Sequence, residues 1–131
     1  MSFDLIDLKI YSPVELILDE SVKELTFQGK EGFLTILSNH IDYVSSFETN
    51  VMNFIDANGE KRFIALTNGI LVKYANKVRL TAYKAILGNS LEELKEKIDE
   101  ISNNDNNIER EINKNLKQLE YYMLNNLTEL K

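Results

Sequence analysis

The spacing of the apolar residues changes at residue 90, and no other feature limits the possible folds as strongly. Before this point, short apolar runs alternate with turns rich in Asn and Gly, a pattern typical of antiparallel strands. After it, Leu and Ile recur every three or four residues, which is typical of amphipathic helices. The sequence therefore predicts a fold that is mainly β plus α, with an N-terminal antiparallel β-sandwich domain in residues 1–87 and a C-terminal two-helix hairpin in residues 88–131.

The strand boundaries are predicted from turn signals. Residues 3–11 alternate between apolar and polar side chains, and Ser12-Pro13 ends that strand. Asn58-Gly59 supplies the positive φ angles of a hairpin turn, and Asn68-Gly69 repeats the signal. Further short strands, each separated from the next by a polar turn, are expected at residues 14–18, 22–27, 34–37, 41–47, 51–55, 61–66, 70–74 and 78–83.

The helical part begins with a capping box. Ser90 can accept a hydrogen bond from the amide of Glu93, whose carboxylate can return to the amide of Ser90. A polar run at residues 102–107 ends this first helix, and a second helix is expected from about Ile108. One apolar stripe on each helix predicts a helical hairpin.

The charge and composition exclude several classes of protein. A net charge of -6 with dispersed Lys and Arg argues against a nucleic-acid partner, since neutralising phosphates requires clustered basic residues. The absence of Cys excludes disulfide scaffolds and thiolate metal sites. No apolar run approaches the roughly 18 to 20 residues that span a bilayer. We therefore expect a soluble, cytoplasmic protein with no direct membrane insertion, which could still sit on a membrane complex.

Residues 29–40 hold the least ordinary local chemistry in the chain. Gly29 and Gly32 flank two charged residues in a tight turn, where backbone freedom matters more than side-chain packing. A short apolar strand follows, and it ends in a polar corner that carries the only histidine, His40. This stretch is therefore the first candidate for a functional site.

The same stretch resembles the epsilon subunit of rotary ATP synthases. That family has a glutamate-glycine turn, a strand written roughly as leucine-x-isoleucine-leucine, and then proline-glycine-histidine. The matching residues in this chain are Glu31-Gly32, Leu34, Ile36-Leu37 and His40. Ser38 stands where the family usually has proline, and Phe33 stands where some members have a second acidic residue.

A second motif extends the resemblance over most of the chain. Residues 65–72, followed by Asn76-Lys77-Val78, look like the family's glycine-centred hairpin, with Asn68 in place of the first glycine. The order of β-sandwich and helical hairpin is also that of the family. Residues 40–43 and 81–87 look more like the alternate, often sodium-linked N-ATPases than the common proton-driven type.

The resemblance implies a non-catalytic subunit of the central stalk. Family members bind the gamma subunit, which forms the shaft, and the membrane rotor ring, and so couple proton or sodium transport to nucleotide chemistry elsewhere. The helical hairpin can fold against the sandwich or transiently reach the catalytic head, where it restrains ATP hydrolysis. The implied location is peripheral, on the inner face of the plasma membrane, as part of the ATP synthase.

The resemblance also implies which residues bind partners. The turn formed by Glu31, Gly32 and Phe33 and the corner at His40 would face the rotor ring. The alternative for His40 is a hydrogen-bonded structural corner, and the alternative for Glu31 is solvation of a tight turn. A metal site at His40 is not expected, because metal sites usually need several ligands and no second His or Cys is available.

A second candidate for partner binding lies on the second helix. Arg110, Lys114 and Lys117 recur at spacings of four and three, which places them on one side of the helix. Glu109 and Glu111 are interleaved with them, so a simple solvated face is the alternative.

No sequence feature indicates catalysis or a cofactor. General acid-base catalysis needs paired titratable groups in a cleft, and no such pair stands out. There is no Walker-type loop or dinucleotide fingerprint, and Ser102 stands where the nucleotide-binding members of the family carry an arginine. We therefore expect no catalytic residue, no cofactor and no ATP binding. The alternative function is a free-standing β-sandwich adapter that docks partners through its helical hairpin.

Overall fold

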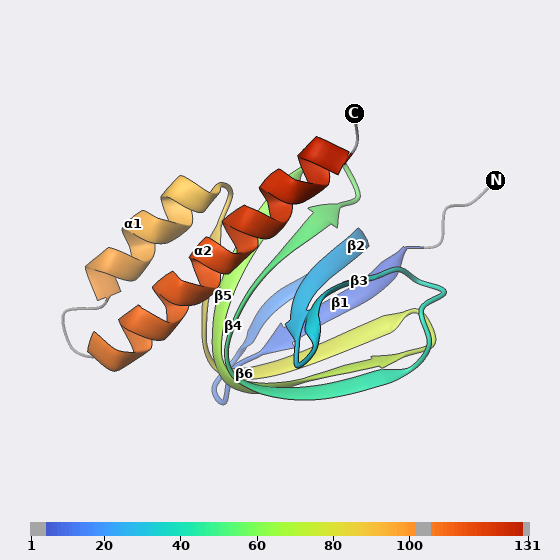
Figure 1. The fold of residues 1–131 in the computed structure, drawn as a ribbon. Coiled ribbons are helices and arrows are strands. Elements are labelled where there is room, and N and C mark those ends of the chain that lie inside the picture. The colour runs from blue at the N-terminus through green and yellow to red at the C-terminus, as the bar shows by residue number, and fades with distance from the viewer. Residues whose placement is uncertain (1–4, 102–105, 130–131) are drawn as a thin grey trace.

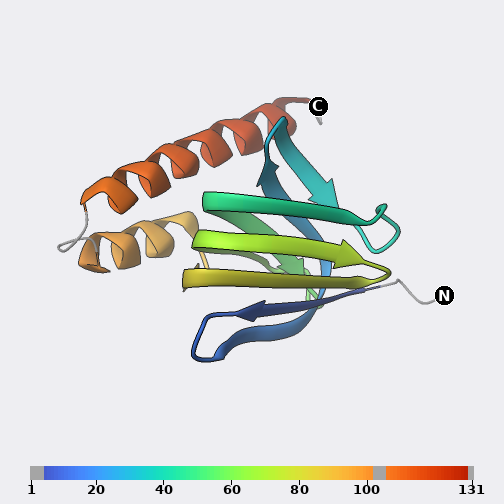
Figure 2. The same ribbon diagram turned by 90° about the horizontal axis from the view of Figure 1, so that it is seen from below.

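The computed structural model describes residues 5–101 and 106–129, with side chains described for residues 5–100 and 110–125. One strongly bent sheet forms the body of the molecule, and two helices lie side by side against its outer face (Figure 1, Figure 2). In chain order the described elements are β1 (Ile6–Tyr11), β2 (Leu16–Gly29), β3 (Gly32–Ile36), β4 (Tyr43–Asp56), β5 (Lys61–Tyr74), β6 (Lys77–Gly88), α1 (Leu91–Ile101) and α2 (Asn106–Glu129).

The sheet closes on itself. Its strand order is β1-β6-β5-β4-β2-β3, and an additional pairing joins β1 back to β2. Paired strands are antiparallel except β1 and β6, which run parallel. The predicted antiparallel β-sandwich with two C-terminal helices is therefore confirmed, apart from this one parallel pair. The division of the chain into two domains at residue 88 stays a prediction.

At three places, two strands that the sequence predicts separately form one continuous strand. Residues 14–18 and 22–27 fall almost entirely within the single strand β2, and the two strands expected on either side of residue 50 are one strand, β4. The prediction of a hairpin turn at Asn68-Gly69 is wrong, because β5 continues through these two residues. The turn predicted at residues 19–21 is wrong for the same reason.

A reversal of the strand faces explains why these positions look like turns in the sequence. On β5, Leu66 and Leu71 both point into the same apolar cluster. Strand alternation alone would put side chains five residues apart on opposite faces. Asn68 lies between them with a φ of 47°, yet the pairing register is the same before and after it. The backbone rotation at Asn68 therefore exchanges the two faces of β5 without ending the strand.

The two strands that flank β5 reverse at the same level. Phe47 and Met52 of β4 belong to one cluster although they also lie five residues apart. Ala82 and Ala85 of β6 belong to the same cluster although they lie three residues apart, another spacing that alternation would put on opposite faces. The three strands therefore cross together from one layer of the sandwich to the other, as Figure 1 shows. Gly69 permits the close approach at this bend, because a Cβ atom there would lie 2.0 Å from the carbonyl oxygen of Thr81.

Two apolar clusters stabilise the fold. The larger one fills the inside of the sandwich and includes Phe27, Phe54 and Leu80. The smaller one lies between the outer face of the sheet and the helices, where strand and helix residues are buried together: Val51, Phe63, Ala65, Leu94, Ile98, Ile112, Leu116 and Leu119. The apolar stripes predicted on the helices are therefore packing surfaces.

The ends of the helices agree with the sequence in most respects. The hydroxyl of Ser90 accepts the amide of Glu93 at 3.1 Å, as predicted, but the carboxylate of Glu93 accepts the amide of Asn89 instead of that of Ser90. This hydrogen bond from Asn89, together with Lys97 at 3.1 Å, holds the pKa of Glu93 below its ordinary value of 4.5. The second helix begins at Asn106, slightly before the predicted Ile108.

Candidate functional site

A shallow groove lies beside the β2–β3 turn, at the stretch that the sequence singled out. Its volume is about 440 Å³, and it is lined by residues 29–34 of the turn and residues 43–45 at the start of β4. Glu31 and Gly32 are exposed at its rim, and Gly32 has a φ of 129°, which favours glycine. The turn predicted from Gly29 and Gly32 is therefore present, and three of the predicted site residues line one groove.

His40 lies in the corner that leads into β4 and is joined to the same groove through Tyr43. The two rings meet edge to face with centroids 6.2 Å apart, and Tyr43 lines the groove. The Nδ1 atom of His40 is 2.7 Å from the carbonyl oxygen of Ile41. The backbone amide of His40 donates to the carbonyl oxygen of Leu37 at 3.0 Å. These contacts agree with a structural corner. His40 thus adjoins the groove through Tyr43, although the corner and the β2–β3 turn lie at opposite ends of β3.

Three apolar side chains around this corner are exposed, and the sequence analysis did not select them. Ile41 is 77% exposed, Val44 is 67% exposed and Leu37 is 45% exposed. Exposed apolar side chains that gather in one place are typical of a binding surface. The signal in the sequence was the apolar Ile41 directly after a polar corner, where a turn is normally polar.

Phe33 differs from the expectation of an exposed turn residue. Its side chain is half-buried, and its ring stacks on that of Tyr122 in α2 with centroids 4.5 Å apart. On the other flank of the turn, Nε2 of Gln28 donates to the carbonyl oxygen of Asn115 and to Oε1 of Gln118, at 3.3 and 3.2 Å. Helix α2 therefore rests on both flanks of the turn, a contact that no local pattern in the sequence indicates.

Arg110, Lys114 and Lys117 lie together on the exposed side of α2, away from the apolar stripe. They line a shallow groove of about 420 Å³, and Tyr121, which is 68% exposed, lies at its end. None of the three forms an ion pair among the described side chains. The structure thus places these predicted residues on one surface. This surface shares no lining residue with the β2–β3 groove.

A further surface lies on the outer face of β4 and β5, where apolar side chains point outward and a charged side chain points inward. Ile70 and Tyr74 point outward and are 46% and 43% exposed, whereas Lys73 between them is buried. Val72 is half-buried and pairs across the strands with the exposed Val44. An apolar outer face of this kind is typical of a surface that a partner covers. The continuous apolar run at residues 70–72 is the signal that could have indicated it.

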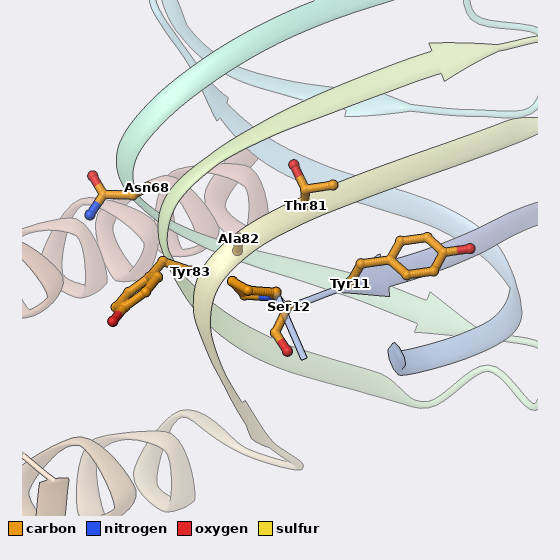
Figure 3. Close-up of a pocket in the computed structure, with 7 residues that line it drawn as sticks. Tyr11, Ser12, Asn68, Thr81, Ala82 and Tyr83 are labelled. Carbon is orange, nitrogen blue, oxygen red and sulfur yellow. The ribbon is translucent and has the colours of Figure 1, made fainter. Parts of the chain in front are cut away.

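A third hollow, of about 580 Å³, lies at the bend of the sheet (Figure 3). Tyr83 is 62% exposed there, and Asn68 lies at the same level on the neighbouring strand. The hollow continues to the end of β1, where Tyr11 pairs with Thr81. The lining is aromatic and hydroxyl-bearing and contains no charged side chain.

Two kinds of feature are absent from the described residues. Among residues 5–100 and 110–125, no three His, Cys, Asp or Glu side chains lie close enough together to hold a metal ion. Neither of the two described helices is long and apolar enough to cross a membrane. Ser102, where an arginine would be needed for nucleotide binding, lies outside the described residues.

Comparison with known proteins agrees with this picture. Residues 5–88 match the family model for the β-sandwich domain of the ATP synthase delta/epsilon chain. An ATP synthase epsilon chain from Clostridium botulinum (strain Hall) is 35% identical over 75 residues, which are 57% of this chain and 56% of the relative. One from Magnetococcus marinus is 28% identical over 87 residues, which are 66% and 63% of the two chains. The match thus spans little more than half the length of these relatives.

Two solved structures share the fold. A chain in the cryo-EM structure of the Euglena gracilis mitochondrial ATP synthase, described as OSCP/F1/c-ring in rotational state 1, aligns with a TM-score of 0.64 at 20% identity, over 92% of this chain and 82% of that one. A chain in the central stalk and c-ring of the Tetrahymena thermophila mitochondrial ATP synthase aligns with a TM-score of 0.57 at 12% identity, over 79% and 76%. At these identities the two alignments support the fold alone.

Proposed function

Because the chain belongs to the delta/epsilon chain family of ATP synthases, we propose that it is a non-catalytic, epsilon-type subunit of the central stalk of a rotary ATP synthase. In this role it couples the gamma subunit to the membrane rotor ring, and its location is peripheral, on the cytoplasmic face of the membrane that holds the ring. The single observation that carries the proposal is the groove between the β2–β3 turn and the start of β4, which the His40 corner adjoins through Tyr43, on a sandwich of this family.

The rotor ring is proposed to bind at this groove and the adjoining corner. Glu31 and Gly32 present charge and open backbone, and the exposed Ile41 and Val44 supply apolar area beside them. A partner that buries these two apolar side chains gains free energy in proportion to the area removed from water. His40 supports the corner from within this surface, through its contact with Tyr43.

The gamma subunit is proposed to cover the outer face of β4 and β5. This face carries Ile70, Val72 and Tyr74 on one strand and Val44 on the next, and no described segment of the chain covers it. Half-exposed apolar residues on a regular sheet suit a second folded surface packed flat against them. The gamma face and the ring surface then share Val44 at their boundary.

The helical hairpin is proposed as a separate unit that contacts the catalytic head transiently and restrains hydrolysis. Its apolar stripe packs on the sandwich, while Arg110, Lys114 and Lys117 face outward without ion-pair partners among the described side chains. A basic surface of this kind suits an acidic one on the head.

A charge substitution in the apolar ring surface tests the proposal. Ile41→Glu combined with Val44→Glu should weaken assembly with the rotor ring by about tenfold or more, because two buried carboxylates would have no partners. The matched control is Val14→Glu, which changes an 89% exposed valine in the β1–β2 connection, away from the proposed surfaces. Both variants should melt at the wild-type temperature.

The measurement is copurification with ATP synthase subunits from the native host. Recovery of gamma and the ring with wild type and Val14→Glu, but not with the double variant, is the expected result. Equal recovery with all three proteins would contradict the ring surface. Recovery of unrelated proteins in place of ATP synthase subunits would favour the free-standing adapter.

A further inference from the structure

Lys73 is a buried cation at the end of β5. Its side chain is 1% exposed and lies on the core-facing side of the strand, the same side as Leu71. Its neighbours Val72 and Tyr74 point outward. An ammonium group in the interior is costly unless it is hydrogen-bonded, so the partners of Lys73 define its role.

The ammonium group joins two segments that are distant in the sequence. Nζ of Lys73 donates to the carbonyl oxygen of His40 and to that of Ala75, both at 2.5 Å. His40 belongs to the corner at residues 37–42, and Ala75 belongs to the β5–β6 turn, where its φ is 51°. A second link joins the same two segments, because the amide of Ala75 donates to Oδ1 of Asp42 at 3.3 Å.

Within the corner, the hydrogen bonds of His40 to Leu37 and Ile41 are local, and among the described residues only Lys73 and the Asp42–Ala75 bond tie its backbone to the β5–β6 end. The corner lies between β3 and β4, outside any strand. Its outer side chain, Ile41, is 77% exposed, and the His40 ring reaches back to Tyr43. The buried ammonium therefore holds the corner from the inside, while the side chains available to a partner lie on the outside.

We propose that Lys73 is the positioning residue of this corner: its ammonium fixes the backbone at His40 and thereby presents Ile41 and His40 in the shape that the rotor ring binds. This inference rests on the proposed function, since the ring is its partner. Lys73 itself touches no partner, because it is buried.

Local hydrogen exchange in the isolated full chain tests the hold on the corner. Lys73→Met keeps most of the unbranched side chain but removes the ammonium, so the amides of His40 and Ala75 should exchange at least about tenfold faster while those of Ile64 and Leu66 stay protected. Lys73→Arg should restore protection, since a guanidinium can donate to both carbonyl groups. Lys61→Met, at the exposed far end of the same strand, is the matched control and should leave all four amides unchanged.

Asp42→Ala tests the second link without entering the core. It should speed exchange at Ala75 but leave His40 protected, because Lys73 still holds His40. This variant keeps the question decidable if Lys73→Met is too unstable to purify. Unchanged exchange in Lys73→Met, or equal loss of protection at both amides in Asp42→Ala, would overturn the inference.

Rebinding to the native ATP synthase stripped of this subunit tests the presentation of the corner. Lys73→Met should bind about tenfold more weakly than wild type, and Lys73→Arg and Lys61→Met should bind normally. Wild-type affinity in Lys73→Met, despite a loosened corner, would overturn the positioning role and leave the proposed function intact. A wild-type chain that does not rebind would refute the proposed function and the docking role of Lys73 together, whereas the exchange result would still decide whether Lys73 holds the corner.

Discussion

The ring of Phe33 stacks on the ring of Tyr122, with centroids 4.5 Å apart and ring planes inclined by 22°. Phe33 follows the β2–β3 turn directly, and Gln28 precedes it and hydrogen-bonds to the same helix at Asn115. Because α2 touches both flanks, the shape of the turn and the docking of α2 form one structural unit.

Disrupting this stack should weaken the docking of α2. Phe33→Ala and Tyr122→Ala should each lower the free energy of unfolding, and a double-mutant cycle should give a coupling of about 0.5 to 1.5 kcal/mol, as for other aromatic pairs. Denaturant unfolding of the four proteins supplies the numbers. Tyr121→Ala is the matched control, since that neighbouring ring is 68% exposed. Strictly additive effects would show that the stack contributes nothing of its own.

The bend of the sheet should depend on Gly69. An alanine Cβ at this position would lie 2.0 Å from the carbonyl oxygen of Thr81 and 2.7 Å from Cζ of Phe47, so the two strands would have to move apart. We expect Gly69→Ala to cost on the order of 3 kcal/mol, or to prevent folding. Thermal unfolding measures this.

Gly59→Ala is the control, because it also replaces a glycine with alanine but lies in the β4–β5 turn, away from the bend. Its φ of 87° makes a side chain strained, but the nearest atom to an added Cβ is 3.8 Å away. It should therefore cost only about 1 kcal/mol. A Gly69→Ala variant that melts no lower than Gly59→Ala would mean that the bend accommodates a side chain.

The helices should open more readily than the strands. α2 is held by one apolar stripe and a few polar contacts, whereas β5 is hydrogen-bonded on both sides and buried on both faces at residues 63–66. Amides from Ile112 to Met123 should therefore exchange faster than those from Ile64 to Val72. Equal protection of the two sets in the free protein would make the hairpin a fixed part of the fold.

A chain truncated after Leu87 should still fold cooperatively. The larger apolar cluster lies within the sandwich and needs no residue from the helices. Truncation exposes Val51, Phe63 and Ala65, so the shortened protein should melt at a lower temperature and bind a dye specific for apolar surfaces. A broad, non-cooperative transition would show that the two units do not fold separately.

The start of α1 should loosen in acid. The pKa of Glu93 is lowered because its carboxylate accepts the amide of Asn89 and lies beside Lys97. A group whose pKa is lower in the folded state stabilises that state above its unfolded pKa, and this contribution is lost as the pH falls through the folded value. Helicity should therefore fall below pH 4.5 in part through Glu93.

Circular dichroism across this pH range, with two variants, isolates the effect. Glu93→Gln should remove part of the acid sensitivity, because the amide side chain does not titrate. Glu96→Gln, on an exposed position of the same helix, should leave the pH dependence as it is. Identical acid transitions in wild type and Glu93→Gln would contradict the assigned role.

The sequence by itself determined the features that depend on neighbouring residues. The change of apolar spacing at residue 90 is local, and so is the cap in which Ser90 accepts the amide of Glu93. Both follow from backbone hydrogen bonding within a few residues, so the order of sandwich and helical pair could be predicted. The turn at Gly29 and Gly32 belongs to the same class, because the φ of Gly32 suits few other residues.

Only the tertiary structure decided what each polar or apolar signal is used for. Asn68 reads as a turn, yet it bends a continuous strand, because β4 and β6 on either side cross between layers at the same level. Lys73 reads as a surface residue, yet it is buried, because two carbonyl groups from distant segments meet its ammonium. Phe33 reads as an exposed turn residue, yet Tyr122, 89 positions later, covers it. In each case the deciding partner is distant in the sequence, and a local pattern carries no information about which distant residue will fill the space beside it.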